Sequence, residues 1–250
     1  MNEATTIEEV ISQLDHIIEW SILNESRAGY FATLYRRMTV AVQQGIINNL
    51  FQDGKRMEQL DVGFANRYFV AWNAYTNKQP CTGAWKLTFD ACENSELICL
   101  QHLILGINTH INFDLCIATA ACCPGDKIFL LESDFNTIND VIATQAQLVQ
   151  DTLCKVWFPL KALNDIANNQ EKAVLNFSID TARSVSWANA IALAHAGDDI
   201  KNQLIGQIDN MVIELSKKII NPGFWVGLTL KPVLLMESKD IGNIIGLLKD

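Results

Sequence analysis

The chain has 250 residues, of which 49% are apolar and 19% charged, and its formal net charge is −9. So acidic a chain is a poor partner for nucleic acid, because phosphate contacts need clustered Lys and Arg side chains. One hydrophobic core can organise this length, and no linker-like stretch interrupts the sequence, so we expect a single helical domain over residues 1–250.

The first residues, Met1 to Ala4, are acidic and lead straight into an amphipathic segment. They lack the basic and apolar regions of a secretory signal, which predicts a cytoplasmic protein. The seven cysteines are an odd number, and most lie in apolar helical patterns, so we expect reduced thiols.

Three helices with short turns are predicted in the N-terminal third. Thr6 and Glu9 have the capping-box spacing, and apolar residues then recur at helical spacing for about five turns. A second apolar stripe begins at Phe31 and is predicted to end near residues 53–54. A third runs over 57–75, before the break at 78–80.

The remaining segments also have helical patterns, and no run alternates with a period of two. Residues 97–121 are apolar on every side, which is typical of a helix that is buried or spans a membrane. The fold class is therefore all-α, an antiparallel multi-helix bundle around one fully buried central helix at about 97–121. Further helices are predicted over 84–92, 134–157, 161–168, 171–196, 198–220 and 240–248.

Five polar residues interrupt the apolar central segment: His102, Asn108, His110, Asn112 and Asp114. They would be costly in lipid, so we expect a buried core helix and no membrane span. A buried polar group without a partner costs about 1 to 3 kcal/mol, so each of these side chains needs one. Their concentration within thirteen positions marks the candidate site, although such residues can also form a network that only fixes helix register.

His110 and Asp114 are one helical turn apart, so their side chains can meet. In a metal-free site, Asp114 orients the His110 imidazole so that it acts as a general base, and His102 is a further candidate catalytic residue. In a metal site, His110 and Asp114 bind a divalent metal such as zinc or iron. The third ligand then comes from another helix, with Asp61, His195 or His16 as candidates.

Substrate-binding candidates surround this pair. Asn108 and Asn112 lie on the same helix, and Asp61 lies on the third predicted helix. Arg37 and Arg183 fall beside apolar residues, where an inward guanidinium suits a carboxylate or phosphate. The alternative for both arginines is an ordinary ion pair. No phosphate-binding loop, serine-nucleophile elbow, HExxH motif or dinucleotide fingerprint is present.

Residues 34–39, 60–68 and 100–115 (LYRRMT, LDVGFANRY and LQHLILGINTHINFDL) resemble a largely bacterial family of unknown function, DUF5995. The likeness extends over most of the chain. It implies an all-helical domain in which His102, His110 and Asp114 match the family pattern, and it brings no activity, substrate or cofactor.

These features favour a helical-bundle protein that binds a small, largely apolar molecule beside the central helix and uses His/Asp/Asn side chains for general acid–base chemistry. One alternative is a metal-dependent hydrolase, since His102, Gly106, Asn108 and His110 are loosely similar to a stretch of the zinc-dependent phospholipases and nucleases of all-α fold. The other is a non-enzymatic scaffold or interaction protein.

Overall fold

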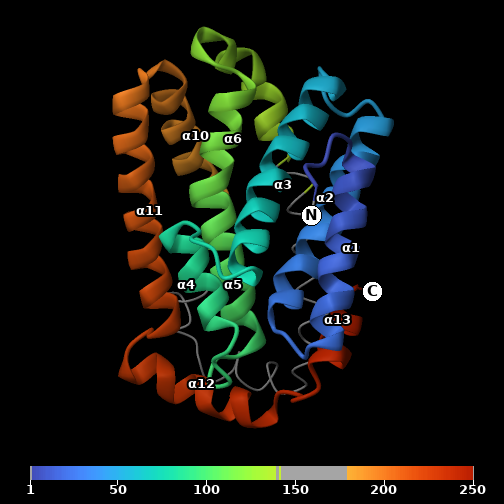
Figure 1. Cartoon of the computed structure of the whole chain (residues 1–250), viewed down its shortest axis with the longest axis vertical. Helices are drawn as coiled ribbons and strands as arrows, with labels where there is room; N and C mark the ends of the chain where they lie inside the picture. The colour runs from blue at the N-terminus through green and yellow to red at the C-terminus, as the bar shows by residue number, and fades with distance from the viewer. Residues whose placement is uncertain (1, 139–140, 142–178, 250) are drawn as a thin grey trace.

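The computed structural model describes residues 2–138, 141 and 179–249, and within these residues it contains helices and no strand. The all-α prediction is confirmed. Most helices stand along one axis of the molecule, and the central helix lies among them (Figure 1). Their bounds are as follows: α1 Ile7–Leu23, α2 Ala28–Ile47, α3 Gly54–Thr76, α4 Gly83–Ala91, α5 Cys99–Thr109, η1 His110–Asp114, α6 Leu115–Cys122, η2 Gly125–Leu131, α10 Ile179–His195, α11 Asp198–Ile220, α12 Phe224–Met236 and α13 Ile241–Lys249.

Local sequence signals determine where the first helices begin and end. The Thr6 hydroxyl accepts a hydrogen bond from the Glu9 amide at 3.2 Å, which is the N-cap that the spacing predicts. The prediction that the second helix ends near residues 53–54 is wrong. It ends at Ile47, because Asn49 takes a left-handed conformation with φ 53° and the Leu50 amide bonds the Gly45 carbonyl at 2.9 Å.

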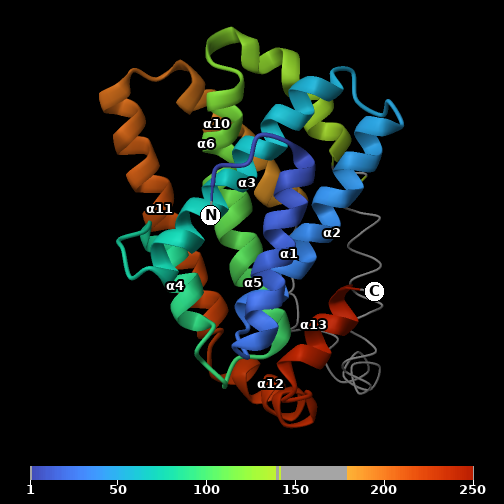
Figure 2. The ribbon, with the colours of Figure 1, turned by 45° about the vertical axis from the view of Figure 1, so that its right-hand side comes forward.

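The central helix comprises α5, η1 and α6 and runs from Cys99 to Cys122, close to the predicted 97–121. It contacts α2, α3, α4, α10 and α11, so other helices cover it on all sides (Figures 1 and 2). By length and composition it could cross a membrane. In this fold, however, 83% of its most apolar stretch is buried. Polar groups on such a helix therefore face protein.

The C-terminal part adds a helix that the sequence did not predict. Helix α12 lies across one end of the bundle (Figure 1), and it was missed because residues 221–223 are a strong stop signal and Pro232 lies inside it. After α12 the Glu237 carboxylate accepts hydrogen bonds from the Cys99 amide at 2.9 and 3.0 Å. A side chain 138 residues away thus caps the start of the central helix.

The helices predicted for the C-terminal half are confirmed in the segments that the structure describes. Helices α10, α11 and α13 occupy the described parts of the segments predicted at 171–196, 198–220 and 240–248. Residues 132–138 are helical, whereas the rest of the predicted helix 134–157, apart from residue 141, and all of 161–168 lie outside the described residues. The six cysteines that the structure describes are free thiols.

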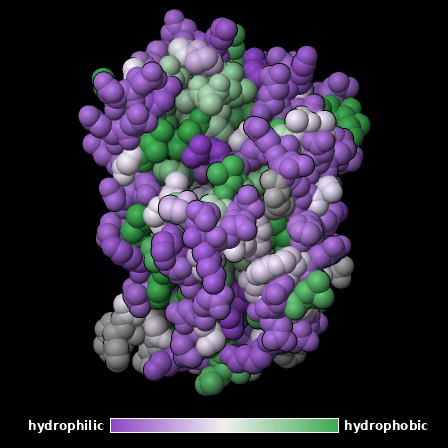
Figure 3. All heavy atoms as spheres, viewed as in Figure 1, coloured by the Kyte–Doolittle hydropathy of each residue, from purple (hydrophilic) through white to green (hydrophobic). Residues whose placement is uncertain are grey.

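The packing that results separates apolar from polar side chains. One hydrophobic cluster joins the N-terminal helices to the central helix, α10, α11 and α13. The face in Figure 3 is covered largely by hydrophilic side chains, with hydrophobic ones scattered between them. The polar side chains of the central helix, Asp114 among them, lie inside this arrangement.

Candidate functional site

Asp114 is a buried carboxylate with three hydrogen-bond donors around it. Its side chain is 1% exposed. One oxygen accepts from Arg67 Nε at 3.0 Å, and the other lies 2.8 Å from Trp85 Nε1 and 3.1 Å from His110 Nδ1. A carboxylate only accepts hydrogen bonds, so the proton of the bond with His110 is on Nδ1, which donates the hydrogen bond to Asp114.

The backbone that carries this pair departs from a regular α-helix. Residues His110–Asp114 form a single π-helical turn, in which the Leu115 amide bonds the His110 carbonyl. Such a turn inserts one extra residue and shifts the side chains that follow relative to those before it. Single π turns inside α-helices are frequent at functional sites, and this one contains both members of the predicted dyad.

The neutral tautomer of His110 has an unprotonated Nε2. Burial lowers the pKa of His110, and the hydrogen bond and charge of Asp114 only partly oppose this effect. The imidazole stacks on Phe64 with ring centroids 3.6 Å apart and meets Tyr35 at 4.4 Å. Nε2 is buried, and it has no hydrogen-bond partner among the described residues. A lone pair without a donor therefore lies inside the protein.

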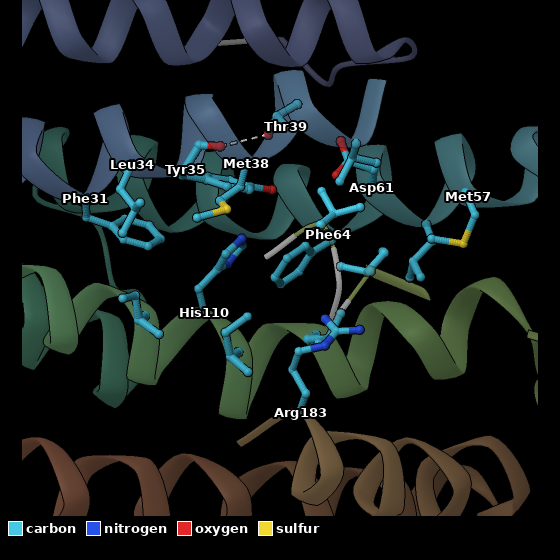
Figure 4. A pocket seen from close by; sticks show the side chains of 17 residues that line it. Phe31, Leu34, Tyr35, Met38, Thr39, Met57, Asp61, Phe64, His110 and Arg183 are labelled. Atoms are coloured by element: carbon cyan, nitrogen blue, oxygen red, sulfur yellow. Dashed lines mark hydrogen bonds between the residues drawn. The ribbon is translucent and has the colours of Figure 1, made fainter. Parts of the chain in front are cut away.

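His110 lines a pocket of about 100 Å³ between α2, α3, the central helix and α10. Figure 4 shows His110 pointing from the central helix toward Tyr35 and Phe64, with Arg183 entering from α10. The pocket is mostly apolar, so its polar groups are few and well defined. Its aliphatic lining includes Leu34, Val42, Met57, Leu60, Ile107, Ile111, Leu115 and Ile138.

Asp61 and Tyr35 contribute two further buried polar atoms to the pocket. Neither Asp61 Oδ2 nor Tyr35 Oη has a hydrogen-bond partner in the described part of the chain. Burial, and secondarily the charge of Glu58, raises the pKa of Asp61 from 3.8 to about 7. Burial also raises the pKa of Tyr35 well above 10, so its hydroxyl stays protonated. Unsatisfied buried groups of this kind need a ligand or ordered water.

Arg183 supplies the only guanidinium among the residues that line this pocket. It is 3% exposed, its carbon Cζ lies 4.3 Å from the centroid of the Phe135 ring, and Nη2 donates to the Phe135 carbonyl. Arg183 therefore points inward, as predicted. The role of Arg183 in binding stays a prediction. The residues brought together here are His110, Asp61, Tyr35 and Arg183.

The raised pKa of Asp61 has a consequence for stability. The unfolded chain ionises this carboxyl above about pH 4, whereas the folded chain keeps it protonated up to about pH 7. The contribution of Asp61 to the free energy of unfolding is therefore present below pH 4 and lost as the pH rises to 7, with a slope approaching about 1.4 kcal/mol per pH unit.

We expect Asp61→Asn to remove this decline in urea denaturation curves measured from pH 4 to 8. Glu214→Gln, at a side chain that is 67% exposed, is the control and should leave the decline in place. Equal slopes in the wild type and Asp61→Asn would contradict a buried, protonated Asp61.

Four other predicted residues lie away from the pocket. The Asn108 amide donates to the Val212 carbonyl at 3.2 Å and to Ser216 Oγ at 2.9 Å, so it joins the central helix to α11. Asn112, one turn later, donates to Asn108 Oδ1 at 3.0 Å. These two residues face α11 and do not line the pocket of His110.

His102 and Arg37 also lie elsewhere. His102 is 3% exposed, its ring meets that of Tyr30 with centroids 6.0 Å apart, and burial lowers its pKa to about 3. Arg37 Nη1 donates to the Leu248 carbonyl at 3.0 Å, so it joins α2 to α13. The structure thus does not bring His102 or Arg37 to the His110–Asp114 pair.

A metal site would need more than the predicted pair. Within residues 2–138, 141 and 179–249, no three His, Cys, Asp or Glu side chains come together in a way that could hold an ion. His195, one of the candidate third ligands, bonds Asp126 on the surface at 3.2 Å, and its side chain is 40% exposed. The metal-dependent hydrolase therefore stays a prediction without a ligand set in this part of the chain.

Sequence reasoning missed several residues that make the site. Trp85 and Arg67 are the other two donors to Asp114, and Tyr35 and Phe64 enclose His110. Helical spacing signals Phe64, because it lies three residues after Asp61 and so shares its face of α3. No signal in the sequence identifies the indole of Trp85 as a partner of Asp114.

Comparisons with known proteins identify a family for this chain but no activity. No curated protein and no solved structure matches the chain. The pattern of DUF5995, described as a family of unknown function, matches residues 7–222, which include the whole central helix, Asp61 and Arg183. Helices α12 and α13 lie beyond the matched residues. The chain therefore belongs to the DUF5995 family of unknown function.

Proposed function

We propose that this protein binds a small, largely apolar molecule in the pocket beside the central helix and acts on it by general acid–base catalysis. The observation that carries the proposal is Nε2 of His110, which has no hydrogen-bond partner among the described residues and lies in an apolar pocket, while Asp114 holds Nδ1 of the same ring. A core that needed only packing gains nothing from a buried acceptor without a donor.

His110 is the general base in this proposal. A proton passes from the bound molecule to Nε2, and the imidazolium that forms keeps its Nδ1 hydrogen bond to Asp114. Arg67 and Trp85 already hold Asp114 in place, so the pair needs little reorganisation when the proton arrives. The faces of Phe64 and Tyr35 also favour a cationic ring beside them.

Asp61 is the matching acid. With its pKa raised to about 7 it is protonated in a large fraction of molecules at neutral pH, and it can return a proton to the bound molecule. His110 and Asp61 come from different helices and line the same pocket. Their two environments favour opposite protonation states, which is what a base and an acid acting on one molecule require.

Filling the pocket tests the proposal. Val42 is buried and lines the pocket, so in Val42→Phe the larger ring should occupy the space of a ligand at a cost in stability of about 1 to 3 kcal/mol. We expect small neutral aromatic compounds such as toluene to raise the melting temperature of the wild type and not that of Val42→Phe.

The matched control is Val70→Phe, the same substitution at a side chain that is 69% exposed on α3. It should keep the wild-type response. If Val42→Phe responds to the compounds as the wild type does, binding is elsewhere and the pocket has been assigned wrongly.

A further inference from the structure

The polar atoms of the pocket limit the kind of ligand group that fits there. His110 Nε2 is an acceptor, because the ring proton is on Nδ1 and bonds Asp114. Tyr35 Oη can donate, because its hydroxyl stays protonated. Asp61 is a donor in its protonated form and an acceptor when ionised. The pocket therefore offers one fixed acceptor and at least one donor.

Charged ligand groups fit this pocket poorly. A carboxylate has no proton to give the His110 lone pair, and it would lose its hydration in a mostly apolar space. An ammonium group has no lone pair with which to accept from Tyr35 Oη, and it would lose its hydration in the same way. A neutral group avoids this loss of hydration.

Among neutral groups, a hydroxyl has the complementary pattern. It has one proton to donate and two lone pairs to accept with, whereas an ether or ketone has no proton for His110. The pocket of about 100 Å³ is also small. Apolar cavities of about 150 Å³ hold benzene, so a ligand body of at most one ring fits this space.

We propose that the ligand is a neutral alcohol or phenol whose hydroxyl donates to His110 Nε2 and accepts from Tyr35 Oη, while its apolar body packs against Phe31, Leu34 and Phe64. This inference rests on the proposed function, since it names the substrate class of the same pocket. It also gives the base its proton, because the hydroxyl that binds Nε2 is the group from which the proton is taken.

A set of one-ring probes tests the inference by isothermal titration calorimetry at pH 7. Benzyl alcohol, benzyl methyl ether, toluene, benzylamine and benzoate share one body and differ in the group that would meet His110. We expect benzyl alcohol to bind the wild type about 10 to 100 times more tightly than toluene or the methyl ether, which is the effect of leaving a buried acceptor unpaired.

Two single-atom variants separate hydroxyl recognition from folding. Tyr35→Phe removes only the pocket hydroxyl and should reduce the preference for benzyl alcohol while toluene binds as before. Tyr30→Phe is the matched control on the same helix, since Tyr30 is buried and does not line the pocket. It should keep the wild-type preference.

The outcomes distinguish this inference from the proposed function. Equal binding of toluene and benzyl alcohol by the wild type would overturn hydroxyl recognition and leave the pocket as a binding site. A preference for benzylamine or benzoate would overturn it in favour of a charged ligand. Failure of every probe to bind would overturn both proposals.

Discussion

Replacing Asp114 with alanine is expected to lower the free energy of unfolding by about 3 to 5 kcal/mol. The reason is the number of groups that this carboxylate satisfies. Its loss leaves the Trp85 indole N–H and His110 Nδ1 buried without an acceptor, and it leaves the Arg67 cation without its counter-ion. Trp85 is 1% exposed, so its buried indole N–H would lose its acceptor.

The matched control is Asp15→Ala, which removes another Arg–Asp pair of the same chain. Asp15 bonds Arg36 Nε at 2.6 Å, but the two side chains are 32% and 27% exposed. Solvated pairs of this kind contribute at most about 1 kcal/mol, so urea denaturation should show a much smaller loss than for Asp114→Ala. Similar losses in the two variants would contradict the view of Asp114 as a buried and fully used acceptor.

Most of the fold was predictable because its outer helices bury an apolar stripe and its central helix is apolar all round. The stripes of α1 and α3, and the all-round apolar character of residues 97–121, predicted helices that the structure confirms. The errors lie where a local turn or a contact with a distant segment determines whether a helix ends or forms. Asn49 ended α2 early, and α12 forms in a segment that its own proline and preceding stop signal argue against. The single-domain prediction stays a prediction.

Only the contacts between residues of the same helix could be predicted, because helical spacing determines them. His110 and Asp114 are four residues apart and do meet, at 3.1 Å. The π turn between them, the cation of Arg67 and the indole of Trp85 depend on how separate helices pack, and helical spacing carries no information about that. The pairing of His110 with Asp61 in one pocket depends on the same packing.

The grouping of all five polar residues into one site was too simple for a geometric reason. Asn108 and Asn112 share one face of the central helix, but Asn108 and His110 are two residues apart and so point about 200° apart around it. The structure uses the two faces differently. Asn108 bonds to α11 and serves helix packing, whereas His110 faces the pocket. Polar residues clustered in sequence on a buried helix can thus serve two separate purposes.

At Gly106 the central helix packs closely against Phe31, which lines the pocket, and Gly106→Ala is expected to lower the free energy of unfolding by about 3 kcal/mol or more. A Cβ atom at this position would lie 2.3 and 2.4 Å from two carbons of the Phe31 ring and 2.8 Å from its Cβ. Phe31 is itself packed against Tyr35 and His110, so its ring cannot move aside without disturbing the site.

Gly206→Ala tests whether this loss comes from the close contact or from the glycine alone. Gly206 lies in α11, where an added Cβ atom would meet no other element of the described chain within 4 Å. Alanine there should therefore raise stability by about 0.5 to 1 kcal/mol through helix propensity. A second change, Phe31→Leu, should restore part of the stability lost in Gly106→Ala. If Gly106→Ala behaved like Gly206→Ala, the helix would not lie against Phe31, and the pocket that Phe31 lines would need a different geometry.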